Sequence, residues 1–146
     1  MSEGRKRFFV SLLGIGAGFL VLRTLIMLYE GALDVLVSWV VALLFLEMVI
    51  DAVAMLICLH WAIAANRKDT DKVLWATSAV IIVHAVRVAI FVLGRTGPWI
   101  DFDIQPAARA LHAARWTWGG VYFAGTMATI SVIGLIIFLY VRNIRR

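Results

Sequence analysis

The sequence has little of what stabilises small secreted domains or builds common catalytic sites. It contains one cysteine and two prolines in 146 residues, and charged residues make up only 16%. A single cysteine excludes a disulfide framework within the chain and a CxxC metal or redox site. No P-loop, GxSxG or HExxH motif occurs, so no enzymatic reaction is indicated. The apolar residues, at 63% of the chain, are therefore its main source of information.

Four long apolar runs predict membrane-spanning helices at residues 8–28, 36–65, 73–93 and 118–141. Each is long enough to cross a hydrocarbon core of ~30 Å at ~1.5 Å per helical residue. The first run follows three basic residues, as a signal peptide would, but it is too long for a signal-peptide core. We therefore expect one all-α domain over residues 1–146, an integral membrane four-helix bundle with an external loop at 94–115.

The basic residues predict how this bundle is oriented. Their excess gives a net charge of +5, but they lie at the ends of the spans, where they meet anionic head groups. This placement indicates a lipid bilayer and not nucleic acid as the partner. Both termini are expected in the cytoplasm, with the chain crossing the cell membrane several times. Nine basic residues mark that side: Arg5, Lys6, Arg7, Arg67, Lys68, Lys72, Arg142, Arg145 and Arg146.

Four ionisable residues lie near the middle of the second and third spans. Glu47 and Asp51 are in the second span, and His84 and Arg87 are in the third. A charge at the bilayer centre costs roughly 2.5–3.5 kcal/mol on insertion scales, so these residues mark a candidate site. The short polar segment 66–72 predicts an antiparallel hairpin that brings the four to similar depths. Aligning the external helix ends places Arg87 beside Glu47, whereas aligning the internal ends places it beside Asp51.

Small residues predict where helices pack closely. Gly14 and Gly18 form a small-xxx-small pair in the first span, and Gly125 supplies a small contact in the last. A second group of residues is expected at the membrane interfaces, where amphipathic and long basic side chains are common. These interfacial candidates are Arg23, Glu30, His60, Trp61, Trp99, Trp116 and Trp118.

Metal and cofactor sites are not indicated. Glu47, Asp51 and His84 are suitable metal ligands by type, but their spacing matches no metal signature and Arg87 would repel a cation. Haem requires two apposed axial ligands, and His60 and His84 lie at different depths. We therefore expect no metal and no cofactor.

The run Glu30 to Asp34 after the first span, the acidic second span and the stretch from Val83 to Val88 carry a family resemblance. They resemble the small four-span YqhA and PsiE families of membrane proteins. YqhA-type proteins have a similar H-x-x-R-V stretch after an acidic second span. PsiE-type proteins similarly have an acidic residue in span two and an arginine in span three. The resemblance implies a four-span topology and the importance of Glu47 and Arg87, and it implies no reaction.

Two functions remain open for these features. The first is translocation of an ion, a proton or a small anion through an oligomer, past the charged residues of spans two and three. The second is a non-catalytic accessory subunit that stabilises or docks a larger membrane complex. A lipid-modifying enzyme is a third reading, which would need a substrate to reach His84 and the carboxylates. The same four residues could also form a structural ion-pair network.

Overall fold

The computed structural model describes residues 2–29, 38–64, 70–93 and 118–144. These residues form four helices, α1 (Glu3–Tyr29), α2 (Ser38–Ala64), α3 (Thr70–Leu93) and α5 (Trp118–Ile144), and no strand. The chain is therefore all-α in its described part, as predicted. Each predicted span falls within one helix, except for residues 36, 37 and 65. Those three residues, like the predicted external loop 94–115, lie outside the described residues.

The sequence explains why the helices are continuous. α2 has 27 residues and α3 has 24, and neither contains glycine or proline, the two poorest helix formers. Both prolines, Pro98 and Pro106, belong to the segment between α3 and α5. α3 begins with Thr70 and has Asp71 in its first turn, where a negative charge interacts favourably with the helix dipole.

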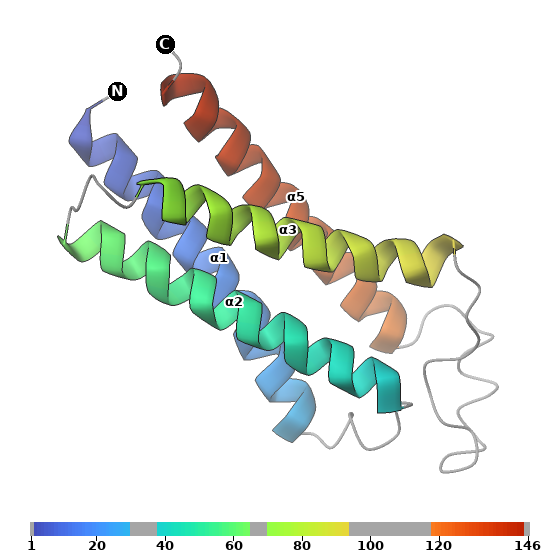
Figure 1. Ribbon diagram of the computed structural model, residues 1–146. Coiled ribbons are helices and arrows are strands. Elements are labelled where there is room, and N and C mark those ends of the chain that lie inside the picture. The colour runs from blue at the N-terminus through green and yellow to red at the C-terminus, as the bar shows by residue number, and fades with distance from the viewer. Residues whose placement is uncertain (1, 30–37, 65–69, 94–117, 145–146) are drawn as a thin grey trace.

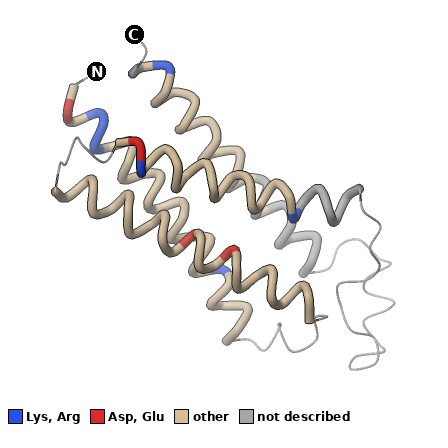
Figure 2. The backbone as a smooth tube through the Cα atoms, viewed as in Figure 1, with Lys and Arg blue, Asp and Glu red and all other residues tan. Residues whose placement is uncertain are grey.

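The helices pack so that each has two main neighbours. α1 packs against α2 and α5, and α3 packs against the same two helices. Figure 1 shows that the start of α1 and the end of α5 lie at the same end of the molecule, near the end of α2 and the start of α3. We call this the basic end, because Lys6, Lys72 and Arg142 belong to the helix turns found there. Figure 2 shows lysine and arginine positions of three helices at this end.

Glycines of α1 allow close approach to two different helices. A Cβ atom on Gly14 would lie 3.2 Å from the Cβ of Cys58 on α2, and one on Gly18 would lie 3.1 Å from Met55 Sδ. Gly16, which the sequence analysis did not single out, faces α5, since its Cβ would lie 3.1 Å from Ile133. These distances leave little room for any side chain.

Gly125 on α5 differs from this pattern. The glycine is exposed, and no described heavy atom lies within 4 Å of the position that its Cβ would take. The described side chains therefore give Gly125 no packing partner, and its packing role stays a prediction. Spacing identified a small residue here, but it could not give the direction in which that residue faces.

Apolar side chains cover the outside of the helices as well as the core. Phe19 on α1, Leu56 on α2 and Trp75 on α3 are 63%, 61% and 79% exposed. By length and composition, α1 and α2 are each able to cross a membrane, and the described part of α5 holds a shorter apolar stretch, Ala128–Asn143. Large apolar side chains on an outer surface suit a hydrocarbon environment better than water.

Candidate functional site: a buried charged cluster

The four ionisable residues singled out from the sequence meet between α2 and α3. Glu47 and Asp51 lie one turn apart on α2, and His84 and Arg87 lie one turn apart on α3. The exposed fraction of each of the four residues is 1% or less. We refer to these four residues as the charged cluster.

Asp51 and His84 form one half of the cluster. The Nε2 atom of His84 lies 3.0 Å from Oδ1 and 2.9 Å from Oδ2 of Asp51. Both distances are those of a hydrogen bond, in which the ring N–H donates to the carboxylate. Asp51 thereby fixes the orientation of the imidazole and places its second nitrogen, Nδ1, toward the other half of the cluster.

Glu47 and Arg87 form that other half. Arg87 Nε donates a hydrogen bond to Glu47 Oε1 in a buried ion pair. The sequence left open whether Arg87 pairs with Glu47 or with Asp51, and the contacts assign Glu47 to Arg87 and Asp51 to His84. An arginine–carboxylate hydrogen bond is among the stronger ones, and burial in a low-dielectric interior strengthens the attraction further.

The Nδ1 atom of His84 joins the two halves. It lies 3.4 Å from Arg87 Nη2, a donor, and 3.5 Å from Glu47 Oε2, an acceptor. A neutral imidazole with its proton on Nε2 accepts from the arginine, whereas an imidazolium directs an Nδ1–H toward the glutamate. Glu47 Oε2 is buried and accepts no hydrogen bond from the described residues, so its lone pairs remain available for that proton. Nδ1 of His84 thus lies between a donor of Arg87 and a free acceptor of Glu47.

A second arginine is level with the cluster. Gly14 packs on Cys58 and Gly18 on Met55, which sets an antiparallel register between α1 and α2. Continuing that register places Arg23 opposite the turns of α2 that carry Glu47 and Asp51. Its Nε atom is buried. The interfacial placement of Arg23 stays a prediction. The glycine pair, which sets the register between spans one and two, is the sequence signal that could have placed Arg23 level with these turns of the second span.

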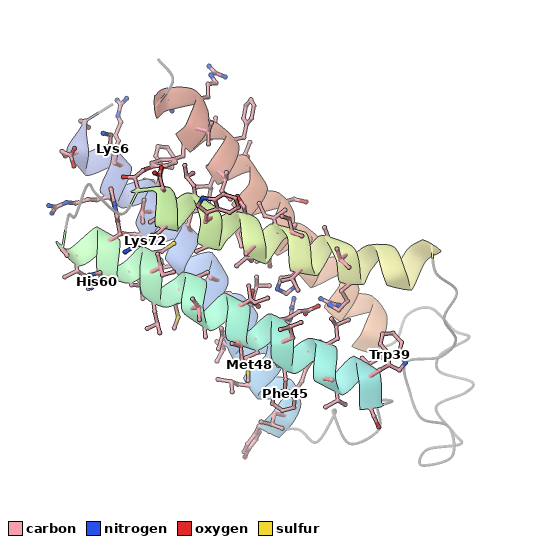
Figure 3. All side chains as sticks on the ribbon, viewed as in Figure 1. Lys6, Trp39, Phe45, Met48, His60 and Lys72 are labelled. Atoms are coloured by element: carbon pink, nitrogen blue, oxygen red, sulfur yellow. The ribbon has the colours of Figure 1, made fainter. Side chains whose placement is uncertain are left out.

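The other predicted interfacial residues divide into three groups. His60 is exposed near the end of α2, and Figure 3 shows it at the basic end. Trp61 is 2% exposed and belongs to the apolar core, and for both residues the interfacial placement stays a prediction. The indole turns inward because its position follows Ala54 and Cys58 along the buried face of α2. Glu30, Trp99 and Trp116 lie outside the described residues, and Trp118 begins α5 without a described side chain.

No group of three or more His, Cys, Asp or Glu side chains in the described residues is placed to hold a metal ion. Comparison with known proteins gave no match to a family model, a curated protein or a solved structure. The resemblance to the YqhA and PsiE families therefore stays a prediction. What can be said about function depends on the charged cluster itself.

Proposed function

We propose that the protein conducts protons across a membrane along a relay from Glu47 through His84 to Asp51: Nδ1 takes up a proton from the Glu47 side, and Nε2 releases its proton to Asp51. The observation that carries the proposal is that each nitrogen of the imidazole faces a different carboxylate, at 2.9 Å for Nε2 and 3.5 Å for Nδ1. Histidine suits this role because its ordinary titration lies near neutral pH and its two nitrogens can bind and release protons on opposite sides. Arg87 holds Glu47 in position by donating to its other oxygen.

A proton fits these contacts better than a larger ion or a small anion. The four side chains are at most 1% exposed and touch one another, and the two hollows described on the surface are not lined by them. A proton passes along hydrogen bonds, whereas a hydrated ion needs an open passage. Burial also argues against docking of a partner at this cluster, because its charges face each other inside the chain.

The proposal places all four helices across a cell membrane as a four-helix bundle. α1 and α2 are long and apolar enough by themselves to cross a membrane. α3 packs antiparallel to α2, and α5 packs antiparallel to α1, as Figure 1 shows. The basic end is proposed to face the cytoplasm with both termini, because the basic residues gather there. The relay lies midway along α2 and α3, so we propose that an oligomer completes the path to either side.

Proton flux in reconstituted liposomes tests the function. Proteoliposomes carrying an internal pH-sensitive dye and an imposed potential should acidify or alkalinise faster than empty ones. His84→Gln keeps an amide that can hydrogen bond but removes the titrating group, so flux should fall to the level of empty liposomes. Thr77→Val is the matched control, because Thr77 is also buried on α3 but its hydroxyl donates to Val73 O at 2.7 Å within its own helix. A folded His84→Gln protein with wild-type flux would refute the relay.

The membrane placement has its own test. A topology reporter fused after Arg146, and another inserted within residues 66–72, should both report the cytoplasm, because the basic residues gather on that side. A reporter that is active outside the cell at either site would overturn the orientation.

A further inference from the structure

A groove runs along the outside of α2 and α3, away from the charged cluster. Its volume is about 500 Å³, and it is lined by Val49, Val53 and Ile57 of α2 and by Trp75, Ala76 and Ala79 of α3. The small side chains of the alanines on α3 leave the groove open, whereas Trp75, which is 79% exposed, forms one side of it. The groove is apolar along this length.

The groove opens at the basic end into a second, more polar hollow. This hollow has a volume of about 300 Å³ and is lined by His60, Trp61 and Lys72, among others. Ile57 and Lys72 line both hollows, so the two adjoin. Figure 3 shows His60 and Lys72 near each other, where α2 ends and α3 begins. One surface feature thus has an apolar body and a polar, positively charged head.

Trp61, otherwise a residue of the apolar core, also lines the polar hollow. Its Nε1 atom is buried and has no hydrogen-bond acceptor among the described residues. A buried indole N–H usually finds a partner, because leaving it unpaired costs free energy. An oxygen of a molecule seated in the hollow would provide the missing acceptor.

We propose that this surface binds one anionic phospholipid, with its phosphate at Lys72, His60 and Trp61 and an acyl chain in the apolar groove. The length of the groove agrees with this occupant. Val49 and His60 are separated by eleven residues of helix, about 16 Å at 1.5 Å per residue, and one leaflet of a bilayer has a hydrocarbon depth of ~15 Å. The inference shares the membrane placement with the proposed function but does not depend on the proton relay.

Charge selects the class of lipid. Lys72 is exposed and lines both hollows. A lysine at this place attracts an anionic head group over a zwitterionic one by roughly fivefold. Asp71, the neighbour of Lys72 in sequence, lines neither hollow.

Native mass spectrometry of the detergent-purified full chain tests the headgroup contact. The probes are dioleoyl phosphatidylglycerol, dioleoyl phosphatidylcholine with the same chains, and water-soluble glycerol 3-phosphate. One phosphatidylglycerol should be retained about fivefold more strongly than phosphatidylcholine, and Lys72→Gln should remove this preference. Lys6→Gln is the matched control, because Lys6 is at the same end but lies 3.7 Å from Glu3 and outside both hollows. Equal effects of the two lysine variants, or glycerol 3-phosphate binding as well as the lipid, would overturn the proposal.

A second pair of variants tests the acyl chain contact. Ala79→Leu fills the groove from its exposed side, so retention of both lipids should fall severalfold. Ala85→Leu makes the same change at another exposed position of α3 that does not line the groove, and it should retain lipid as the wild type does. Because both sites are exposed, neither variant disturbs the core. Unchanged retention by Ala79→Leu, with melting temperature preserved, would refute the groove as the acyl site.

Discussion

The two described histidines show how differently one residue type is used in the middle and at the end of the same helix pair. His84 is fully buried and lies between two carboxylates and an arginine. His60 is exposed and lines a surface hollow with Lys72 at the basic end. The difference teaches that the charged side chains in the middle of the helix pair interact with one another, whereas those at the basic end face outward. Mutations in the middle should therefore be costly and strongly coupled, and those at the end should be mild.

The largest expected effect is the loss of Arg87. Arg87→Met leaves Glu47 as a buried carboxylate without its ion-pair partner, which should cost about 3–5 kcal/mol of unfolding free energy. Combining it with Glu47→Gln should recover part of this loss, because no buried charge is then stranded. Combining it with Asp51→Asn should not, since Asp51 contacts His84. Denaturant unfolding in detergent measures the cycle, and additive losses in both combinations would contradict the pairing.

Arg23 should rank second. It is level with the two carboxylates of α2 through the register of α1 and α2, so Arg23→Met should cost about 1.5–3 kcal/mol. Lys6→Met is the control for removing a basic side chain from α1 at the exposed, basic end. If both substitutions leave the melting temperature unchanged, Arg23 does not contribute to the charge balance of the cluster.

Substitutions of the glycines of α1 should have the third-largest effect on stability. Gly14→Leu forces a side chain against Cys58 and Leu59, which should cost about 1–3 kcal/mol. Gly18→Leu should cost less, because the atom in its way is the thioether of Met55, a flexible side chain. Gly125→Leu on the exposed face of α5 is the comparison and should be nearly neutral. Thermal unfolding ranks the three, and an equal loss in all of them would mean that helix propensity and not packing decides.

The smallest effect is expected at His60. His60→Gln changes an exposed side chain that lies outside the core, so its unfolding free energy should stay within about 0.5 kcal/mol of wild type. His84→Gln measured alongside should lose clearly more, because it replaces a fully buried ring that is fitted between Asp51 and Arg87. Similar losses for both histidines would remove the contrast between the middle and the end.

Much of the helical architecture could be predicted from the sequence, because a long apolar run without proline has few alternatives to a helix. Depth along a helix was equally accessible, which is why the four members of the charged cluster could be grouped before their contacts were known. The direction in which each residue faces around the helix axis could not be predicted. Trp61 turns into the core, Gly125 turns out, and Gly16 faces α5, and only packing against neighbours sets these directions.

Arg23 illustrates a further limit. Its depth depends on how α1 slides along α2, and this offset is set by the fit of Gly14 against Cys58 and Leu59. Hydropathy gives the ends of a span only to within a turn or two, and that uncertainty is enough to change which turn of α2 lies level with Arg23. The sequence also could not show that Arg87 pairs with Glu47 and His84 with Asp51, because this pairing depends on which rotamers of His84 and Arg87 fit together.

The buried thiol beside Gly14 makes the chain a ready-made reporter of its own opening. Cys58 is 0% exposed, and the protein has no other cysteine. A maleimide reagent can therefore reach a sulfur only while α1 is separated from α2, and no background cysteine needs to be removed first. The rate of alkylation then reports how often α1 separates from α2, in the native protein and without any engineered label.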